Sequence, residues 1–282
     1  MVSILKKIIL LIFFMTKGKN KMMNTKKRGK NKYSTTIISS VLLILFFIYF
    51  LFFSNADWSL FKEQFLNFEK MEGRYYIFIS PFFLVLKISF FSCFFASLIG
   101  LCFAVIRNYN FKILDMLITS YVVLFRSIPA MVLVVLVYFA LPFVGLNLPS
   151  TNSVIMSLSL LFGAYTTEIF RSGINSVDKL QIEASKSLGM NSLKTMRFII
   201  LPQAMRVVIP PLTTVLIDVL KTTSIAYVVG VPELIARARQ MEGVIGSVTP
   251  LIFVSILYFL IILPVVILSS RLEKRSRKWS KA

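Results

Sequence analysis

The sequence predicts an all-α protein, a polytopic membrane helix bundle with about six transmembrane helices. Of its 282 residues, 57% are hydrophobic and 16% are charged, and the mean hydropathy is +0.80. A soluble domain of this length is not so apolar. Uncharged stretches of about twenty residues recur, which is the length that one helix needs to cross a bilayer. Basic residues fall in blocks between these stretches, where they determine topology.

Composition also excludes several functions. The net charge of +20 is common in nucleic-acid-binding proteins, but here the basic blocks flank apolar spans, so we expect no nucleic-acid partner. The two cysteines, Cys93 and Cys102, lie in one apolar span, and histidine is absent. A disulfide framework and a Cys/His metal site are therefore excluded, and we expect neither a metal nor a cofactor.

Residues 1–33 form a basic N-terminal extension that we expect to stay in the cytoplasm, since it holds ten Lys or Arg and no acid. Its apolar run Ile8–Met15 reaches only about 12 Å as a helix, whereas the hydrocarbon core is roughly 30 Å thick. We expect a non-structural extension, for which Met15, Met22 and Met23 are alternative starts.

The first predicted span, residues 34–53, is twenty residues without a charge and looks like an addition to the core that follows. The polar segment 55–75 should lie outside, with aromatic interface anchors at Trp58, Tyr75 and Tyr76.

The second span covers residues 77–106 and is interrupted only by Lys87. Its uncharged part, 88–106, has nineteen residues, so Lys87 is placed at the outer end, where its side chain can reach water. Residues 107–126 are interpreted as a short basic loop on the inside, and residues 127–145 as the third span.

The fourth span, residues 152–170, carries Glu168, which is three residues before Arg171 and close enough to pair with it. The last span, residues 249–270, has twenty-two uncharged residues and leads into a basic cytoplasmic tail, residues 271–282.

The fifth span, residues 207–229, contains Asp218 and Lys221, whose charges should face the bundle interior or water because charge in lipid is costly. Two interpretations are open: the two residues pair on one helix face, or they lie on the transport pathway. Polar residues also accumulate in the fourth and fifth spans, where they either line a hydrophilic route or make helix contacts. They are Tyr165, Thr166, Thr167, Thr213, Thr214, Thr222, Thr223 and Ser224.

Counting basic residues supports this topology. With residues 231–248 as a second outer loop, the inside segments hold 25 of the 32 Lys and Arg and the outside segments hold five. The positive-inside rule then places both termini of this multi-pass protein in the cytoplasm, with the lipid bilayer as its surroundings.

Residues 171–206 form a basic polar loop between the fourth and fifth spans, on which the functional prediction depends. Asp178 has Gln181 three residues on, the spacing of a capping box, and Gly189 is suited to the left-handed conformation that ends a helix. The pattern predicts one helix of about ten residues, starting near Lys179, with a small apolar stripe at Leu180, Ala184 and Leu188.

A second helix in the same loop is predicted to start at Asn191 or Ser192 and to run until Pro202, which cannot donate the next backbone bond. Two short helices with basic flanks suit docking into the groove of a partner protein. The alternative is an ordinary cytoplasmic loop lying on the lipid headgroups.

These residues carry a family resemblance. The run Glu183-Ala184-Ser185, then Gly189, then Ile200-Leu201-Pro202 resembles the EAA loop in the membrane subunits of ATP-binding cassette (ABC) importers. The segments that look like the polar amino-acid branch of that family are Phe125-Arg126-Ser127-Ile128-Pro129, Gly163-Ala164-Tyr165, Glu168-Ile169-Phe170-Arg171, Pro202-Gln203-Ala204 and Lys221-Thr222-Thr223-Ser224. The match covers roughly Tyr76 to Arg275.

The resemblance implies a permease domain at residues 77–270 with a five-helix core, coupled to a separate ATP-binding subunit and located in the bacterial plasma (inner) membrane. Its coupling residues would be Glu183, Ala184, Ser185, Leu188, Gly189, Leu201 and Pro202, with the helix from Glu183 to Gly189 seated in a cleft of the ATPase. Candidate pathway residues are Tyr165, Glu168, Asp218, Lys221, Thr222, Thr223 and Ser224. The chain departs from the family where Leu180 replaces a Gly, Ser185 replaces an Ala, and Thr222 replaces an Asp.

The chain has no G-x-x-x-x-G-K-[ST] sequence, so we expect no nucleotide site and no enzyme activity of its own. Two further hypotheses stay open beside the importer subunit. One is a secondary transporter or channel that uses Asp218 and Lys221, although such proteins usually contain internal repeats. The other is a membrane scaffold whose loop recruits a partner.

For the importer, we expect a second permease, as a homodimer or heterodimer, because one five-span half encloses little volume. An extracytoplasmic solute-binding protein would deliver a polar amino acid to it.

Overall fold

The computed structural model describes residues 39–46, 49, 57–109 and 111–279 of the chain. The chain consists of two compact units, Met1–Ser59 and Leu60–Ala282. In the first unit, residues 39–46 are helical, whereas the basic extension and most of the first predicted span lie outside the described residues.

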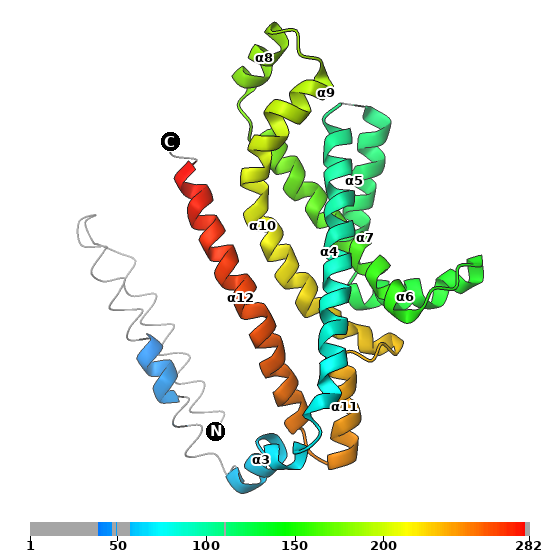
Figure 1. Cartoon of the computed structure of the whole chain (residues 1–282), viewed down its shortest axis with the longest axis vertical. Coiled ribbons are helices and arrows are strands. Elements are labelled where there is room, and N and C mark those ends of the chain that lie inside the picture. Colours follow the sequence, from blue (N-terminus) through cyan, green and yellow to red (C-terminus); the bar gives the residue numbers. More distant parts are fainter. Residues whose placement is uncertain (1–38, 47–48, 50–56, 110, 280–282) are drawn as a thin grey trace, which may run out of the picture. The chain divides into compact units, whose positions relative to one another are not determined.

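The second unit consists of helices connected by turns, which confirms the prediction of an all-α membrane bundle (Figure 1). Four helical segments of the described chain are long and apolar enough to cross a membrane. They contain α4 (Ile79–Arg107), α7 (Ser150–Asn175), α10 (Leu201–Thr222) and α12 (Thr249–Trp279). A bent pair, α5 (Lys112–Ser127) with α6 (Ala130–Ala140) and η3 (Leu141–Val144), brings the number to five if it is one broken span.

Helices α4 and α7 form the tightest pair of the bundle because small and polar residues let their backbones approach closely. A Cβ atom at Gly100 would lie 2.2 Å from Oγ1 of Thr166, and that hydroxyl donates a 2.6 Å hydrogen bond to the carbonyl of Ala96. On the other side, a Cβ atom at Gly173 would lie 2.3 Å from the Val208 side chain of α10. Glycine at these positions is typical of close helix packing in membranes.

The prediction of an inner loop at residues 107–126 is wrong. Most of it is helix α5, which meets α6 at an angle of 107° across a break at Ile128 and Pro129. Ile128 is extended (ψ 129°), as is usual before proline, so the helix ends there. Two of the charges that suggested a loop pair with each other in the fold, since Arg107 lies 2.6 Å from Asp115.

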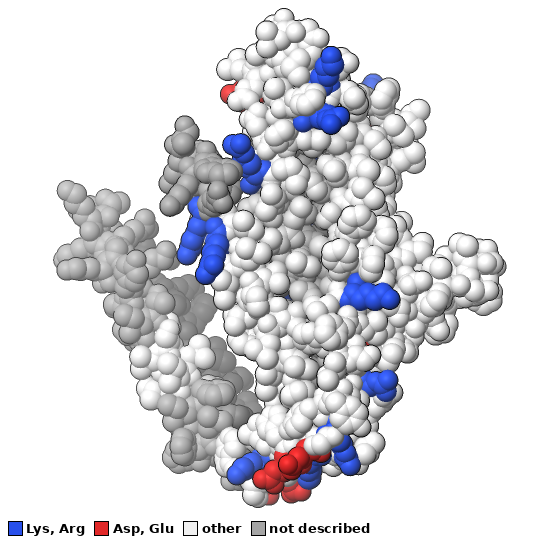
Figure 2. Space-filling view, viewed as in Figure 1, with Lys and Arg blue, Asp and Glu red and all other residues white. Residues whose placement is uncertain are grey.

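The two predicted outer loops are short helices packed on each other. They are α3 (Trp58–Phe65), η1 (Phe68–Met71), η2 (Tyr75–Phe78) and α11 (Leu234–Ile245). The carbonyl of Gln64 accepts hydrogen bonds from the Val248 amide and the Ser247 hydroxyl. Most of the acidic side chains visible in Figure 2 gather at this end.

Glu233 caps α11 and is completely buried. Its carboxylate accepts hydrogen bonds from the amides of Ile235 and Ala236, both at 2.8 Å, and from the Tyr258 hydroxyl at 3.2 Å. Burial raises the pKa of Glu233 above its ordinary value, and these hydrogen bonds oppose the shift.

Candidate coupling loop and pathway cavity

The first helix of the polar loop is α8 (Lys179–Ser187), which lies with α9 (Ser192–Thr195) beyond the end of α10 (Figure 1). The carboxylate of Asp178 accepts a 2.9 Å hydrogen bond from the Leu180 amide, as the sequence predicted. Gly189 is left-handed (φ 76°), and the amides of Gly189 and Met190 bond back to the carbonyls of Lys186 and Ser185. This is a Schellman cap, so the residue that ends α8 was correctly identified.

The two faces of α8 differ. Ser185 is 3% exposed, and its hydroxyl donates to the carbonyl of Ile182 and lies 3.0 Å from the Thr195 hydroxyl. Serine therefore fits in place of the family's alanine, because its extra polar group is hydrogen-bonded. On the other face, Leu180 and Leu188 are 70% and 82% exposed. Glu183, Ala184 and Gly189 are exposed as well.

The second helix starts as predicted but does not end at Pro202. The side chain of Asn191, rather than that of Ser192, caps it by accepting from the Lys194 amide. After α9, the chain makes a π turn, Met196–Ile200, and continues directly into α10. The wide turn bonds the Leu201 amide to the Met196 carbonyl, so Pro202 falls in the first turn of α10, where a missing amide is tolerated.

Leu201 is half-buried and Pro202 is exposed at the base of the loop. Beside them, the side-chain amide of Gln203 donates to the side-chain oxygen of Gln181 and thereby ties α8 to α10. The Gln181 side chain therefore accepts a hydrogen bond from Gln203 across the loop.

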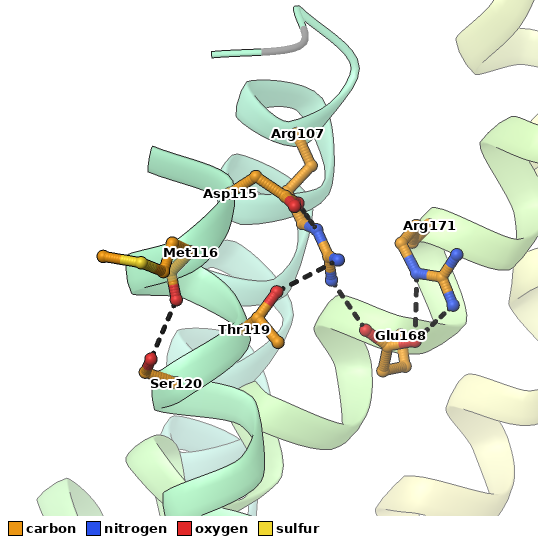
Figure 3. Close-up of polar contacts among 7 residues, drawn as sticks. All are labelled: Arg107, Asp115, Met116, Thr119, Ser120, Glu168 and Arg171. Atoms are coloured by element: carbon orange, nitrogen blue, oxygen red, sulfur yellow. Dashed lines mark hydrogen bonds and ion pairs between the residues drawn. The ribbon is translucent and has the colours of Figure 1, made fainter. Parts of the chain in front are cut away.

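An ion-pair cluster joins α4, α5 and α7 near the start of the loop (Figure 3). Glu168 pairs with Arg171 at 2.6 Å, as its spacing predicted, and also with Arg107 at 2.9 Å. Arg107 in turn pairs with Asp115 and donates to the Thr119 hydroxyl. The pairing of Arg107 with Asp115 was not predicted, although opposite charges on both sides of a short turn were a usable signal.

A cavity of about 540 Å³ lies where α5 breaks into α6, against α7 and α10. Its lining includes four candidate pathway residues, Tyr165, Asp218, Lys221 and Thr222. It also includes Arg126, whose guanidinium lies 5.0 Å from the ring centroid of Tyr165. Arg126 was missed as a cavity residue because it had been assigned to an inner loop.

Asp218 and Lys221 do not neutralise each other. Both are exposed, and no ion pair joins them or connects them to any other residue that the structure describes. The geometry therefore does not support the interpretation that the two residues pair. It leaves two uncompensated charges that face one cavity.

Three other candidate pathway residues lie elsewhere. Glu168 belongs to the ion-pair cluster. Thr223 and Ser224 lie in η5 (Thr223–Val229), directly after α10, and their hydroxyls donate to the Leu220 and Lys221 carbonyls of α10. In the described ranges, no group of three or more Cys, Asp or Glu side chains could hold a metal ion.

Residues 96–278 match the model of a protein family described as "Binding-protein-dependent transport system inner membrane component". "Probable amino-acid ABC transporter permease protein YckA" of Bacillus subtilis (strain 168) is 36% identical over 191 residues, which cover 67% of this chain and 84% of the relative. "Probable glutamine ABC transporter permease protein GlnP" of the same organism is 36% identical over 162 residues, covering 57% and 74%.

Solved structures agree. A chain from "Crystal structure of an amino acid ABC transporter with histidines" superposes with a TM-score of 0.68 and 32% identity, covering 74% of this chain and 98% of that one. A chain of the MetNI methionine ABC transporter has a TM-score of 0.63 at 22% identity, a likeness that shows the fold alone.

Proposed function

The chain belongs to the family of binding-protein-dependent transport system inner membrane components, and from this premise we propose that it is the permease subunit of an ABC importer for a polar amino acid. The names of the relatives, which mention amino acids and glutamine, support this substrate class. A secondary transporter or channel is not favoured, because the family match includes Asp218 and Lys221.

The observation that carries this proposal is the exposed face of α8. A helix with its two ends fixed by Asp178 and Gly189 presents Leu180 and Leu188 to the surroundings, beyond the long apolar helices. An exposed apolar stripe on a fixed helix suits insertion into a partner's groove. Glu183, Ala184, Leu188 and Gly189 would contact a separate ATPase, while Ser185, Leu201 and Pro202 would hold the shape of the loop.

ATP hydrolysis belongs to that partner in this proposal, because the sequence contains no Walker A loop. Residues 77–270 would form the permease domain, with 171–206 as its cytoplasmic coupling loop. Residues 1–33 and 271–282 would be cytoplasmic, and 34–53 would be an additional transmembrane helix of this inner-membrane protein.

The cavity supplies groups that match a zwitterion. The carboxylate of Asp218 can bind an ammonium group, and Arg126 and Lys221 can bind a carboxylate. These charges cannot face lipid at low cost, so we assign this face to the pathway and to a second permease, identical or homologous. An extracytoplasmic solute-binding protein would load it.

Co-purification of the ATPase tests the coupling loop. Glu183→Lys, which reverses an exposed charge, and Gly189→Pro, which removes the cap geometry, should each release the ATPase while the permease still inserts into the membrane. Glu72→Lys is the matched control, because Glu72 is exposed at the opposite end, between η1 and η2. Retained ATPase in both loop variants would contradict the assignment.

A further inference from the structure

A second hollow of the molecule lies between α4 and α7 and is almost entirely apolar. Its volume is about 570 Å³. Four side chains at four-residue spacing on α4 and five on α7 line it. They are Lys87, Phe91, Phe95 and Ile99 on α4, and Asn152, Ile155, Met156, Ser159 and Leu160 on α7. We call this the Lys87 groove.

The groove is separate from the pathway cavity. Met156 in the groove and Tyr165 in the cavity are nine residues apart on α7, which at about 100° per residue places them on opposite sides of the helix. The groove therefore opens away from Asp218 and Lys221. Lys87 also precedes residues 96–278, the part that matches the family model.

The depth of the groove is set by the charges on α4. Lys87 and Arg107 are twenty residues apart, about 30 Å along a helix, which equals the thickness of a hydrocarbon core. Lys87 thus lies at the level of the lipid headgroups, near the start of α7, and the uncharged residues between them cross the acyl region. From Lys87 to Ile99 the groove follows about 18 Å of helix, close to the depth of one leaflet.

The polar groups at the headgroup end have no protein partner. Lys87 and Asn152 are exposed, and neither side chain makes a hydrogen bond or ion pair with another described residue. Farther along, Phe91, Phe95 and Met156 are exposed apolar side chains, and Ser159 satisfies its hydroxyl on the Ile155 carbonyl. One cation and one amide thus lie at the headgroup end of the Lys87 groove, whose apolar part is about as long as one leaflet is thick.

We infer that the Lys87 groove binds one phospholipid with an anionic headgroup, its phosphate on Lys87 and Asn152 and an acyl chain along Phe91, Phe95 and Ile99. An ammonium group and a side-chain amide can both donate hydrogen bonds to a lipid phosphate, and the apolar walls replace contacts with neighbouring lipids. The inference is independent of what the protein transports.

Native mass spectrometry of the purified full-length chain tests it, with phosphatidylglycerol and phosphatidylcholine of the same acyl chains as probes. The unmodified protein should retain one phosphatidylglycerol in preference to phosphatidylcholine. Lys87→Gln should reduce that preference about fivefold, the effect of one basic residue facing an anionic headgroup. Lys112→Gln, which removes a charge outside the groove at the start of α5, should leave it unchanged. No preference in the unmodified protein, or equal loss in both variants, would overturn the inference.

A fluorescence measurement locates the lipid. With Trp58 and Trp279 replaced by Phe, Phe95→Trp should be quenched more by brominated phosphatidylglycerol than by brominated phosphatidylcholine, and Lys87→Gln should abolish the difference. Inorganic phosphate should not compete, because it lacks the acyl chain, and competition would refute a lipid ligand. In a variant with Cys93 and Cys102 changed to Ser, a disulfide between two copies through Met156→Cys would show a second chain in the groove instead.

Discussion

The coupling loop and the pathway cavity are built in opposite ways. The loop is local: Asp178 and Gly189 fix α8 within twelve consecutive residues, and its functional face is simply left exposed. The cavity is assembled from α5, α6, α7 and α10, and its charges are brought together from positions that are up to 95 residues apart, Arg126 and Lys221. The loop can therefore be predicted from sequence and should tolerate substitutions elsewhere in the chain. The cavity, in contrast, depends on every helix that forms its wall.

The largest expected effect separates the two regions. Asp218→Asn should abolish amino-acid uptake, because it removes the only carboxylate that the structure places on the cavity wall. ATPase co-purification should be unaffected, since α8 is untouched. Uptake in reconstituted vesicles is the measurement, and unchanged uptake would assign Asp218 a structural role.

The ion-pair cluster joins α4, α5 and α7 near the start of the loop, so its loss should lower the stability of the bundle. Glu168→Gln leaves Arg107 and Arg171 without their shared carboxylate and should lower the free energy of unfolding by about 2 kcal/mol, the usual contribution of charge-assisted hydrogen bonds. Thermal unfolding in detergent measures this change. Glu273→Gln, an exposed carboxylate on α12, should have no such effect, and equal losses in both variants would mean that the cluster contributes nothing specific.

The cap of α8 tests whether the loop acts alone. Asp178→Ala removes the hydrogen bond to the Leu180 amide and should destabilise α8 by about 1 kcal/mol. Affinity for the ATPase should then fall by about fivefold, while thermal unfolding of the bundle stays the same. Asp178→Asn should keep most of the affinity, because asparagine also caps helices. An affinity unchanged by Asp178→Ala would show that the partner itself orders the helix.

The smallest effect is expected far from both regions, at Glu233. Its pKa is raised above 4.5 by burial, so the folded protein binds more protons than the unfolded chain between the ordinary pKa and the raised one. The stability contributed by protonated Glu233 is therefore complete below about pH 4.5 and is lost as pH rises through the folded pKa. Glu233→Gln should flatten this pH dependence of thermal unfolding, and an unchanged profile would assign it to other groups.

Sequence reasoning succeeded where the signal was local. The ends of α8, the cap at Asn191 and the pair Glu168–Arg171 follow from spacing within one turn or two. It failed where a distant residue changes the local rule. Arg107 at the end of α4 pairs with Asp115, and the segment that was interpreted as a charged loop is helix α5.

The predictions for Arg126 and for Pro202 were wrong for the same kind of reason. Arg126 reaches the cavity only because α5 is a helix that runs back along the bundle. Pro202 does not end a helix because the π turn before it bonds the Leu201 amide to the Met196 carbonyl, so that Pro202, which has no amide hydrogen, falls in the first turn of α10. A widened turn has no signature in a single sequence, and neither has the packing that brings Arg126 to the cavity wall.

The π turn has a mechanical consequence. From Ser192 to Val229 the chain is one helical stretch of 38 residues, so Leu193 in the loop and Asp218 in the cavity wall belong to the same stretch, which also contains Pro210 and Pro211. A displacement of the loop by a few ångströms would be transmitted along the axis of this stretch, because no loop interrupts it. Rotation about that axis would swing the Asp218 carboxylate sideways, and the amount of swing is set by how far the widened turn winds or unwinds.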